Sequence, residues 1–396
     1  MLKATLPAHV PHPFSPAGRV NPYPAYAWFR ENDQVHFEKF SGWWFVASHA
    51  GCASALADAC FSASLGQQER TREDDLPASM LMSDPPDHAR LRGPGALLLG
   101  PAALRAQTGG LGDAVSGVLD GLAGRDEADT TADIGEPFAV EVFTRLLALD
   151  AGQVPAFTSL ARRVSVNLDP MGGPEAGQAG RAAVAEFSAF MDHHIQVLQA
   201  AGVDCPLVHL AADPRLTRGE MLGILSLSVV GGFLPLADLV SHAVHWLTPV
   251  PGLFASLREE IPDGPATNRD GGVVDELMRL STPIPFTARV TRQETELDGM
   301  LLPASARVLL VIASANRDAA VFERPDEFDP RRSPNPHLAF GGGPHLCLGA
   351  PLVRWAGGAL LRELAIRFPG LRQLGKADWN NAMVPRRLLG QRLQLR

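Results

Sequence analysis

The sequence predicts a single domain that is mainly helical, with a smaller strand-rich region. Two patterns support this expectation. Through residues 86–247, apolar positions recur at the spacing of successive helices. Through residues 288–315 the apolar positions alternate, and the pair Asp298-Gly299 marks a turn, as in short strands. The 396 residues contain no internal repeat and no clear linker, so we expect one domain over residues 1–396.

The N-terminal part should begin the strand-rich region. Residues 1–20 are rich in proline and predict an extended arm on the surface of the domain. A short helix and two strands are expected within residues 25–45, because VHFEKF and GWWFVA carry aromatic and branched residues. Ser48 is a suitable N-cap for a helix that reaches Ala57.

The helices of the middle of the chain follow. We predict them at residues 87–98, 108–122, 137–147, 154–164, 181–199 and 218–247. Thr217 should cap the last of them. Its uncharged stretch, residues 221–237, reaches only the lower end of a membrane-spanning length and contains glycines and a proline, which favours a buried core helix. Residues 263–272 then predict a polar loop, and residues 273–280 another helix.

Composition narrows the function classes. The net charge of −8 argues against a nucleic-acid partner, because phosphate binding favours a basic surface. No secretory signal pattern opens the chain, so we expect a cytoplasmic protein without a membrane anchor. Four cysteines are scattered without CxxC pairs, which suggests neither a zinc site nor a disulfide framework. They are Cys52, Cys60, Cys205 and Cys347.

The stretch FGGGPHLCLG places Cys347 in a constrained loop. A dinucleotide fingerprint is a poor match, because Leu346 stands where its last glycine is required. A phosphate loop is unsupported, since the only Gly-Lys pair is followed by Ala377. A nucleophilic cysteine would need a base, and His345 is poorly placed two residues away. A thiolate ligand of haem iron fits better, because backbone N–H groups and a following helix can stabilise the charged sulfur.

This stretch resembles the cysteine-ligand signature of the cytochrome P-450 family, FGxGxHxCxG, at every specified position. The resemblance implies the family's fold and a haem b cofactor, with Cys347 as the axial ligand of the iron. It also places Phe340, His345 and Gly349 against the haem. Phe340 would shield the sulfur from water.

Further marks of the family occur in the expected order. Glu276 and Arg279 match its ExxR pair, with Arg332 as the third member. By themselves the first two could form a surface pair on a helix. His88 and Arg92 match HxxxR, although that spacing is also common on a solvated helix face. The resemblance assigns these two residues to the haem propionates together with two others, Arg289 and His345.

The long helix departs from the family pattern. Family members usually carry a small-Gly-x-acid-Thr run there, which delivers protons to bound dioxygen. Here the run is GGFLP: Gly231 and Gly232 are retained, while Leu234 and Pro235 replace the acid and the threonine. Neither can relay a proton. Pro235 lacks an N–H and should kink the helix, so a pocket for dioxygen formed by Gly231, Gly232 and Pro235 is still expected.

The resemblance also indicates where substrate would lie. Segments that line the pocket in this family imply an apolar, fairly bulky substrate. The corresponding residues here are Met80, Met82, Phe233, Leu234, Ile284 and Phe286. Each could equally be a core residue.

These observations predict a haem-thiolate monooxygenase that hydroxylates or epoxidises an apolar natural-product intermediate. Electrons should come from a separate ferredoxin and its reductase, with Arg354 near their docking face, and the protein should be a monomer. Because of Leu234 and Pro235, two other chemistries stay open: oxidation without oxygen insertion, and reaction driven by peroxide. A non-catalytic haem scaffold or sensor is the alternative from another class.

Overall fold

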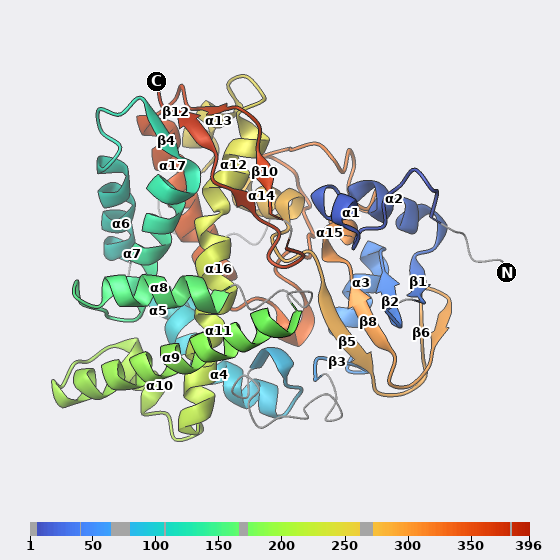
Figure 1. The fold of residues 1–396 in the computed structure, drawn as a ribbon, viewed down its shortest axis with the longest axis horizontal. Helices are drawn as coiled ribbons and strands as arrows, with labels where there is room; N and C mark the ends of the chain where they lie inside the picture. Colours follow the sequence, from blue (N-terminus) through green and yellow to red (C-terminus); the bar gives the residue numbers. More distant parts are fainter. Residues whose placement is uncertain are drawn as a thin grey trace.

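The structure is a computed structural model, and it describes residues 6–39, 41–64, 80–106, 108–165, 173–261, 272–380 and 382–396. Figure 1 shows a helical part that packs against a smaller part containing the largest sheet and the N-terminal helices. This arrangement confirms the predicted fold class, mainly helical with a strand-rich side.

Helices make up most of the described chain. The first nine are α1 (Pro16–Val20), α2 (Tyr23–Asn32), α3 (His49–Ala57), α4 (Asp87–Leu99), α5 (Pro101–Ala106), α6 (Thr108–Asp120), α7 (Glu136–Leu146), α8 (Val154–Ser165) and α9 (Gly173–Ala200). They are followed by α10 (Pro206–Ala211), α11 (Arg218–Ala237), α12 (Leu239–Leu247), α13 (Leu253–Glu260), α14 (Val273–Ser281), α15 (Ile312–Ala315), α16 (Ala350–Leu352) and α17 (Gly358–Arg367). Short 3-10 or π turns are η1 (Met80–Met82), η2 (Thr130–Gly135), η4 (Gly343–His345) and η5 (Val353–Gly357).

In the residues that the structure describes, the strands are short and form four small sheets. They are β1 (Val35–Glu38), β2 (Trp43–Val46), β3 (Phe61–Ser62), β4 (Glu127–Asp129), β5 (Thr287–Thr291), β6 (Thr295–Leu297), β7 (Met300–Leu302), β8 (Arg307–Leu310), β9 (Arg372–Leu374), β10 (Asp378–Trp379), β11 (Leu388–Leu389) and β12 (Arg392–Gln394). The largest sheet has the order β1-β2-β8-β5-β3, and β2 pairs with β8 in parallel, Phe45 opposite Leu309. The predicted turn is confirmed, because Asp298 and Gly299 join β6 to β7 with positive φ angles.

Most predicted helices are present, and two boundaries need correction. The extended arm over residues 1–20 is wrong for its last five residues, which form α1 because Ser15 caps it and Pro16 suits its first position. Helix α9 begins at Gly173 rather than residue 181. The predicted loop at 263–272 lies outside the described residues except for Gly272.

The predicted long helix is divided into α11 and α12. Thr217 caps α11, and a capping box with Glu220 reinforces its start. The helix continues through Pro235 to Ala237, so the interruption falls at Asp238 rather than at the proline. Within the described residues, this stretch alone is long and apolar enough to cross a membrane, but 78% of its most apolar window is buried inside the fold. This burial agrees with the prediction of a core helix.

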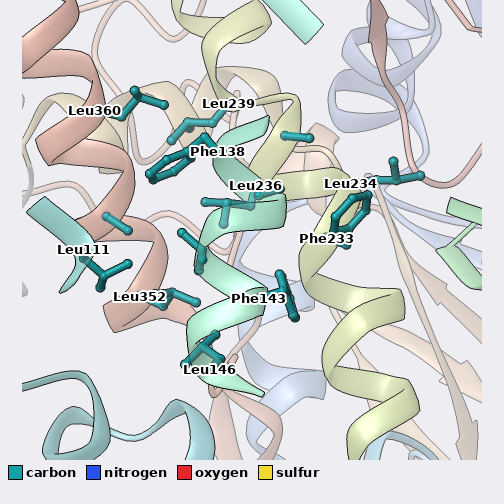
Figure 2. Close-up of a cluster of buried hydrophobic side chains, with 14 of the residues drawn as sticks. Leu111, Phe138, Phe143, Leu146, Phe233, Leu234, Leu236, Leu239, Leu352 and Leu360 are labelled. Carbon is teal, nitrogen blue, oxygen red and sulfur yellow. The ribbon is translucent and has the colours of Figure 1, made fainter. Parts of the chain in front are cut away.

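The main core lies where α7, α11 and α17 meet. Figure 2 shows Phe138 and Phe143 of α7 between Leu360 of α17 and side chains of α11. Phe138 and Leu360 are completely buried. Because interiors pack closely, this core fixes the position of α11 relative to the rest of the helical part.

Candidate functional site

The loop before α16 holds Cys347 in a defined turn. The Cys347 N–H donates to the carbonyl of Phe340 at 2.8 Å, which closes the loop. Gly341 and Gly343 have positive φ angles of 72° and 59°. A Cβ atom on Gly343 would lie 2.3 Å from the carbonyl oxygen of Leu56, so only glycine fits there.

The sulfur of Cys347 is surrounded by hydrogen-bond donors. The backbone N–H groups of Gly349 and Ala350 point at it and favour the thiolate, as do the charges of Arg92 and Arg354. Burial outweighs them and raises the pKa of the Cys347 thiol above its ordinary value. The residue is nevertheless exposed in the structure. An electrophilic metal ion bound to the sulfur would overcome the cost of forming the thiolate.

The helix expected near Leu348 begins slightly later, as α16 at Ala350. It is only three residues long and continues through η5 into α17. The N-terminal N–H groups of this segment include the Ala350 donor to the sulfur.

Four basic side chains gather beside the loop. The rings of His88 and His345 lie 4.1 Å apart, and Arg92 donates to the carbonyl of Leu346 at 2.5 Å. Arg289, on β5, is 4% exposed and donates to the Ala288 carbonyl at 2.7 Å. None of the four forms an ion pair with an acidic side chain among the described residues.

The positive charge of each of these side chains therefore disfavours the protonated form of its neighbours. Burial, His88 and Arg289 lower the pKa of His345 to about 4. Burial also lowers the pKa of the Arg289, Arg92 and His88 side chains. Two of the four, His88 and Arg92, line a hollow of about 500 Å³, together with Pro85, Ala89, Gly93, Ala96, Pro344 and Leu348. A ligand with two carboxylates would relieve this unbalanced positive charge.

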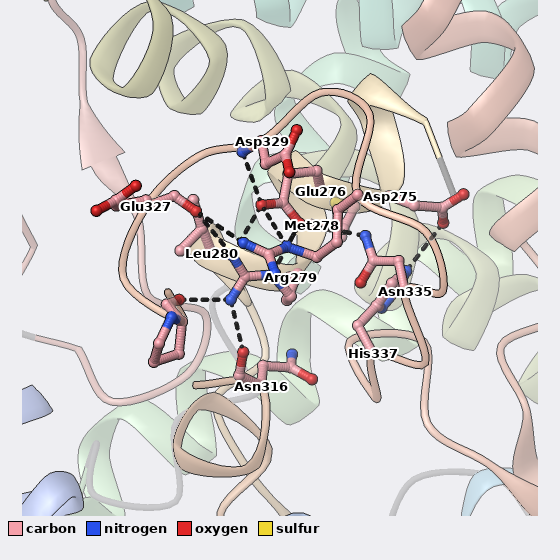
Figure 3. Close-up of polar contacts among 12 residues, drawn as sticks. Asp275, Glu276, Met278, Arg279, Leu280, Asn316, Glu327, Asp329, Asn335 and His337 are labelled. Atoms are coloured by element: carbon pink, nitrogen blue, oxygen red, sulfur yellow. Dashed lines mark hydrogen bonds and ion pairs between the residues drawn. The ribbon is translucent and has the colours of Figure 1, made fainter. Parts of the chain in front are cut away.

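A buried ionic network supports the loop from behind (Figure 3). Glu276 and Arg279 are completely buried and joined by two bonds of 2.7 and 2.8 Å. Arg332 donates to Glu276 at 3.1 Å, as predicted for the third member, and Asn335 donates to it at 3.2 Å. The surface-pair alternative for Glu276 and Arg279 is therefore wrong, because no solvent reaches either side chain.

Arg354 has an internal partner rather than a free, outward-facing charge. Its Nε donates to buried Asp275 at 2.9 Å, and its guanidinium lies 4.7 Å from the ring centre of Phe340. His337 approaches the same Asp275 oxygen at 2.9 Å. The hypothesis that Arg354 meets an acidic partner is therefore not supported; the side chain ties α14 to the cysteine loop.

One face of α11 opens onto space. Along this largely buried helix, partly exposed residues recur at helical spacing: Leu227, Ser228, Gly231, Gly232 and Pro235. Gly231 is the most open, since a Cβ atom there would meet nothing within 4 Å. Gly231 and Pro235 are thus both partly exposed on one side of α11, whereas a Cβ atom on Gly232 would lie 3.0 Å from the ring of Phe143. A dioxygen pocket formed by the three residues stays a prediction.

Phe233 points away from the open face of α11, and Leu234, three residues after Gly231, lies beside it but is buried. The Phe233 ring is completely buried, 6.0 Å from the ring of Phe143 and 6.2 Å from that of Phe157. Leu234 is 5% exposed and belongs to the same core. The prediction of Phe233 as a substrate contact is corrected, because its ring is held between those of Phe143 and Phe157. Leu234 as a substrate contact stays a prediction.

The other proposed substrate contacts lie on two sides. Met80 is buried and Met82 is 41% exposed, both in η1, which packs on α4. Ile284 and Phe286 precede β5 and belong to one apolar cluster with Met383 and Val384 of the C-terminal region.

Comparisons with known proteins agree with this geometry. The family model "Cytochrome P450" matches residues 271–368. Nocardicin C N-oxygenase of Nocardia uniformis subsp. tsuyamanensis is 31% identical over 379 residues, covering 91% of this chain and 92% of that protein. The monooxygenase PikC of Streptomyces venezuelae is 30% identical over 365 residues, covering 89% and 85%.

A solved structure gives the same result. The crystal structure of the cytochrome P450 enzyme CYP109B1 from Bacillus subtilis superposes with a TM-score of 0.82 at 27% identity, covering 95% of this chain and 99% of that one. The fold and the cysteine site define a haem-thiolate protein. The chain belongs to the cytochrome P450 family, a family of monooxygenases whose members bind haem b.

The residues present fit that cofactor. Cys347 supplies one accessible sulfur in a ring of N–H donors, and the four basic side chains supply unpaired partners for two propionates. In the described part of the chain, no group of three or more His, Cys, Asp or Glu side chains could hold a metal ion.

Proposed function

We propose that this protein inserts one oxygen atom of dioxygen into a bulky, largely apolar small molecule, by hydroxylation or epoxidation, in a natural-product pathway. The observation that carries the proposal is Cys347 in its donor-lined loop beside four basic side chains without carboxylate partners. Two relatives support the substrate class: one is named for nocardicin C, and the other is a Streptomyces monooxygenase. A ferredoxin and its reductase supply electrons to a cytoplasmic monomer.

Each part of the site has a task in this proposal. Haem, when bound, supplies the redox centre at which dioxygen is activated. Gly349 and Ala350 orient and stabilise the Cys347 thiolate through their N–H groups, and Phe340 excludes water from it. The four basic side chains, His88, Arg92, Arg289 and His345, hold the propionates.

The open face of α11 gives the reacting substrate room. Gly231 keeps this face free of side-chain atoms, and Ile284 and Phe286 form an apolar wall. Leu234 and Pro235 carry no exchangeable proton, so the protons consumed in dioxygen reduction come from ordered water or from a hydroxyl of the substrate.

The lack of a proton donor at Leu234 and Pro235 also favours a second candidate function. If no water reaches the open face, the enzyme would use hydrogen peroxide, or would oxidise its substrate without oxygen insertion. Peroxide already carries the two protons and two electrons that dioxygen would need, so a relay is dispensable.

Two measurements separate these functions. Reduced protein with carbon monoxide should give the Soret shift of a thiolate-ligated haem, and Cys347→Ser should abolish it. Turnover of candidate substrates is then compared with dioxygen plus ferredoxin and with peroxide alone. Strong activity with peroxide only would replace the first function by the second. A normal Soret shift without any oxidised product would favour a haem scaffold.

A further inference from the structure

Two neighbouring arginines near the C-terminus are paired very differently. Both belong to the C-terminal hairpin that β10 and β11 form by antiparallel pairing. Arg387 is held by Asp238, a completely buried acid whose two oxygens accept from its Nε and Nη2 at 2.6 and 2.9 Å. Arg386 is 6% exposed and has no acidic partner among the described residues. Its Nη2 donates to the Val20 carbonyl at 3.3 Å, and its buried Nε has no acceptor.

Arg386 and a second buried arginine, Arg317, are stacked on aromatic side chains. The guanidinium of Arg386 lies 3.4 Å from the ring centre of Trp379 and 5.3 Å from that of Tyr23. The guanidinium of Arg317 lies 3.5 Å from the ring centre of Tyr23 and 5.3 Å from that of Trp246. Tyr23 is therefore a common neighbour of both cations.

His245 completes a closed circuit of such contacts. Its ring centre lies 5.4 Å from that of Trp246 and 5.6 Å from that of Trp379. The side chains come from α2, from α12, from the segment after α15 and from the hairpin. We call them the basic–aromatic cluster, in which the two kinds alternate in this order: Tyr23, Arg317, Trp246, His245, Trp379 and Arg386.

The cluster contains more buried hydrogen-bond donors than acceptors. The Nε of Arg317 and the Nε1 of Trp246 are buried without a partner, like the Nε of Arg386. His242, on α12, is 1% exposed, both of its ring nitrogens lack a partner, and its ring lies 5.8 Å from that of Trp379. Because folded proteins rarely leave buried donors without acceptors, four such side chains around the same aromatic rings indicate that an acceptor binds there.

The charge of the cluster favours an anion as that acceptor. Among the described residues one acid pairs with the two guanidinium groups: Asp326 accepts from Arg317 at 2.9 Å, and its side chain is 70% exposed. Burial, together with the charge of Arg317, lowers the pKa of Arg386. Burial and the charge of Arg386 lower the pKa of His242 to about 3, so this ring is neutral and can offer an N–H. Ordered water would satisfy the donors but would leave the charge of Arg386 unbalanced, whereas an anion does both.

We propose that the basic–aromatic cluster binds one small monovalent anion of the chloride type between Arg317 and Arg386. The Nε1 of Trp246 and an N–H of His242 complete its set of donors. The stacked aromatic faces attract the two cations without cancelling their charge, so they do not replace the anion. The anion joins α2, α12 and the hairpin, and it stabilises the folded chain. None of these side chains is assigned to haem or to substrate, so the inference goes beyond the proposed function and does not depend on it.

The test measures the chloride dependence of the stability of the holoprotein. Thermal unfolding is followed by circular dichroism at one scan rate, in about 5 and about 200 mM chloride, with gluconate keeping the ionic strength constant. A ligand that binds only the folded chain raises the unfolding temperature as its concentration rises. For a dissociation constant of about 10 mM and a chain of 396 residues, we expect a rise of about 2 °C.

Arg386→Met removes the charge and the Nε while keeping a long side chain. This variant should lose the dependence on chloride, with a rise below about 0.5 °C. The matched control is Arg307→Met, because Arg307 is exposed and its guanidinium lies 5.8 Å from the ring centre of Trp43, outside the cluster. The control should keep the full rise. If Arg386→Met does not fold, Trp246→Phe decides, because it removes one N–H donor and should reduce the rise to about half.

Bromide locates the anion directly. Crystals of the holoprotein soaked in bromide should give an anomalous peak beside the Nε atoms of Arg317 and Arg386. An equal rise in the wild type and in Arg386→Met, or ordered water without a bromide peak in the cluster, would overturn the inference. A bromide peak without any chloride-dependent rise would mark an adventitious ion only and would overturn it as well.

Discussion

Replacing Glu276 by glutamine tests the network behind the cysteine loop. The change keeps the size of the side chain and removes its charge. Glu276 is completely buried and accepts from Arg279, from Arg332, from Asn335 and from the N–H of Asp329. Two buried guanidinium groups would lose their only acidic partner among the described residues.

The size of the effect follows from this burial. Breaking a buried ion pair by removing one partner costs about 3–5 kcal/mol. Arg279 keeps three carbonyl acceptors, those of Asn316, Pro325 and Glu327, so we expect a loss near the lower limit, about 3 kcal/mol. Domains of this kind are stable by about 5–15 kcal/mol, so the loss is a substantial fraction.

The assay is urea unfolding of the holoprotein, followed by tryptophan fluorescence and by the Soret band. The control is Glu260→Gln, which removes the acidic partner of Arg331. The side chain of Arg331, next to Arg332 in the chain, is 79% exposed. Because water solvates that pair, no measurable change is expected. A loss below about 1 kcal/mol for Glu276→Gln, or equal losses in both variants, would refute the reasoning.

Three further predictions concern single side chains. Arg289→Met should weaken haem retention about tenfold or more, because a charge-assisted hydrogen bond is lost. Haem transfer to apomyoglobin measures this retention. Thermal unfolding should show that the apoprotein of the variant is at least as stable as that of the wild type. Cys347→Ser should retain the fold by circular dichroism while losing the thiolate-type Soret shift. Burial lowers the pKa of His242 from 6.5 to about 3, so protonation favours the unfolded chain. The contribution of the neutral His242 side chain to the free energy of unfolding is fully present above pH 6.5. It is lost as the pH falls from 6.5 toward 3, because only the unfolded chain then binds the proton. The loss amounts to about 2 kcal/mol at pH 5. His242→Phe should remove that part of the pH dependence in urea unfolding; an unchanged slope would contradict it.

Much of the candidate site could be predicted from sequence because its constraints are local. The cysteine loop needs glycine where φ is positive and a donor-rich turn around one sulfur, and Gly341, Gly343 and Cys347 meet these needs within seven positions. Likewise, the three-residue spacing of Glu276 and Arg279 places both on one face of α14.

Two features of the site were not predicted correctly, for different reasons. Helical periodicity places Phe233 about half a turn away from Gly231, so its assignment as a substrate contact could have been avoided. The pairing of Asp238 with Arg387 could not be predicted, because it arises only when the hairpin folds back over 149 residues.

The packing around Leu234 explains why this fold does not accommodate an ionised acid at position 234. Leu234 is 5% exposed inside the main core, where an ionised aspartate would need a buried partner and would otherwise cost several kcal/mol, of the order of 3–5. A buried acid follows the end of the helix, one turn later at Asp238, where both oxygens accept from Arg387. A carboxylate held in that way positions a hairpin and does not deliver protons. Restoring an acid at position 234 alone would therefore disturb the core without recreating a relay, and any route for protons has to be sought along the open face of α11, among water, substrate and Ser228.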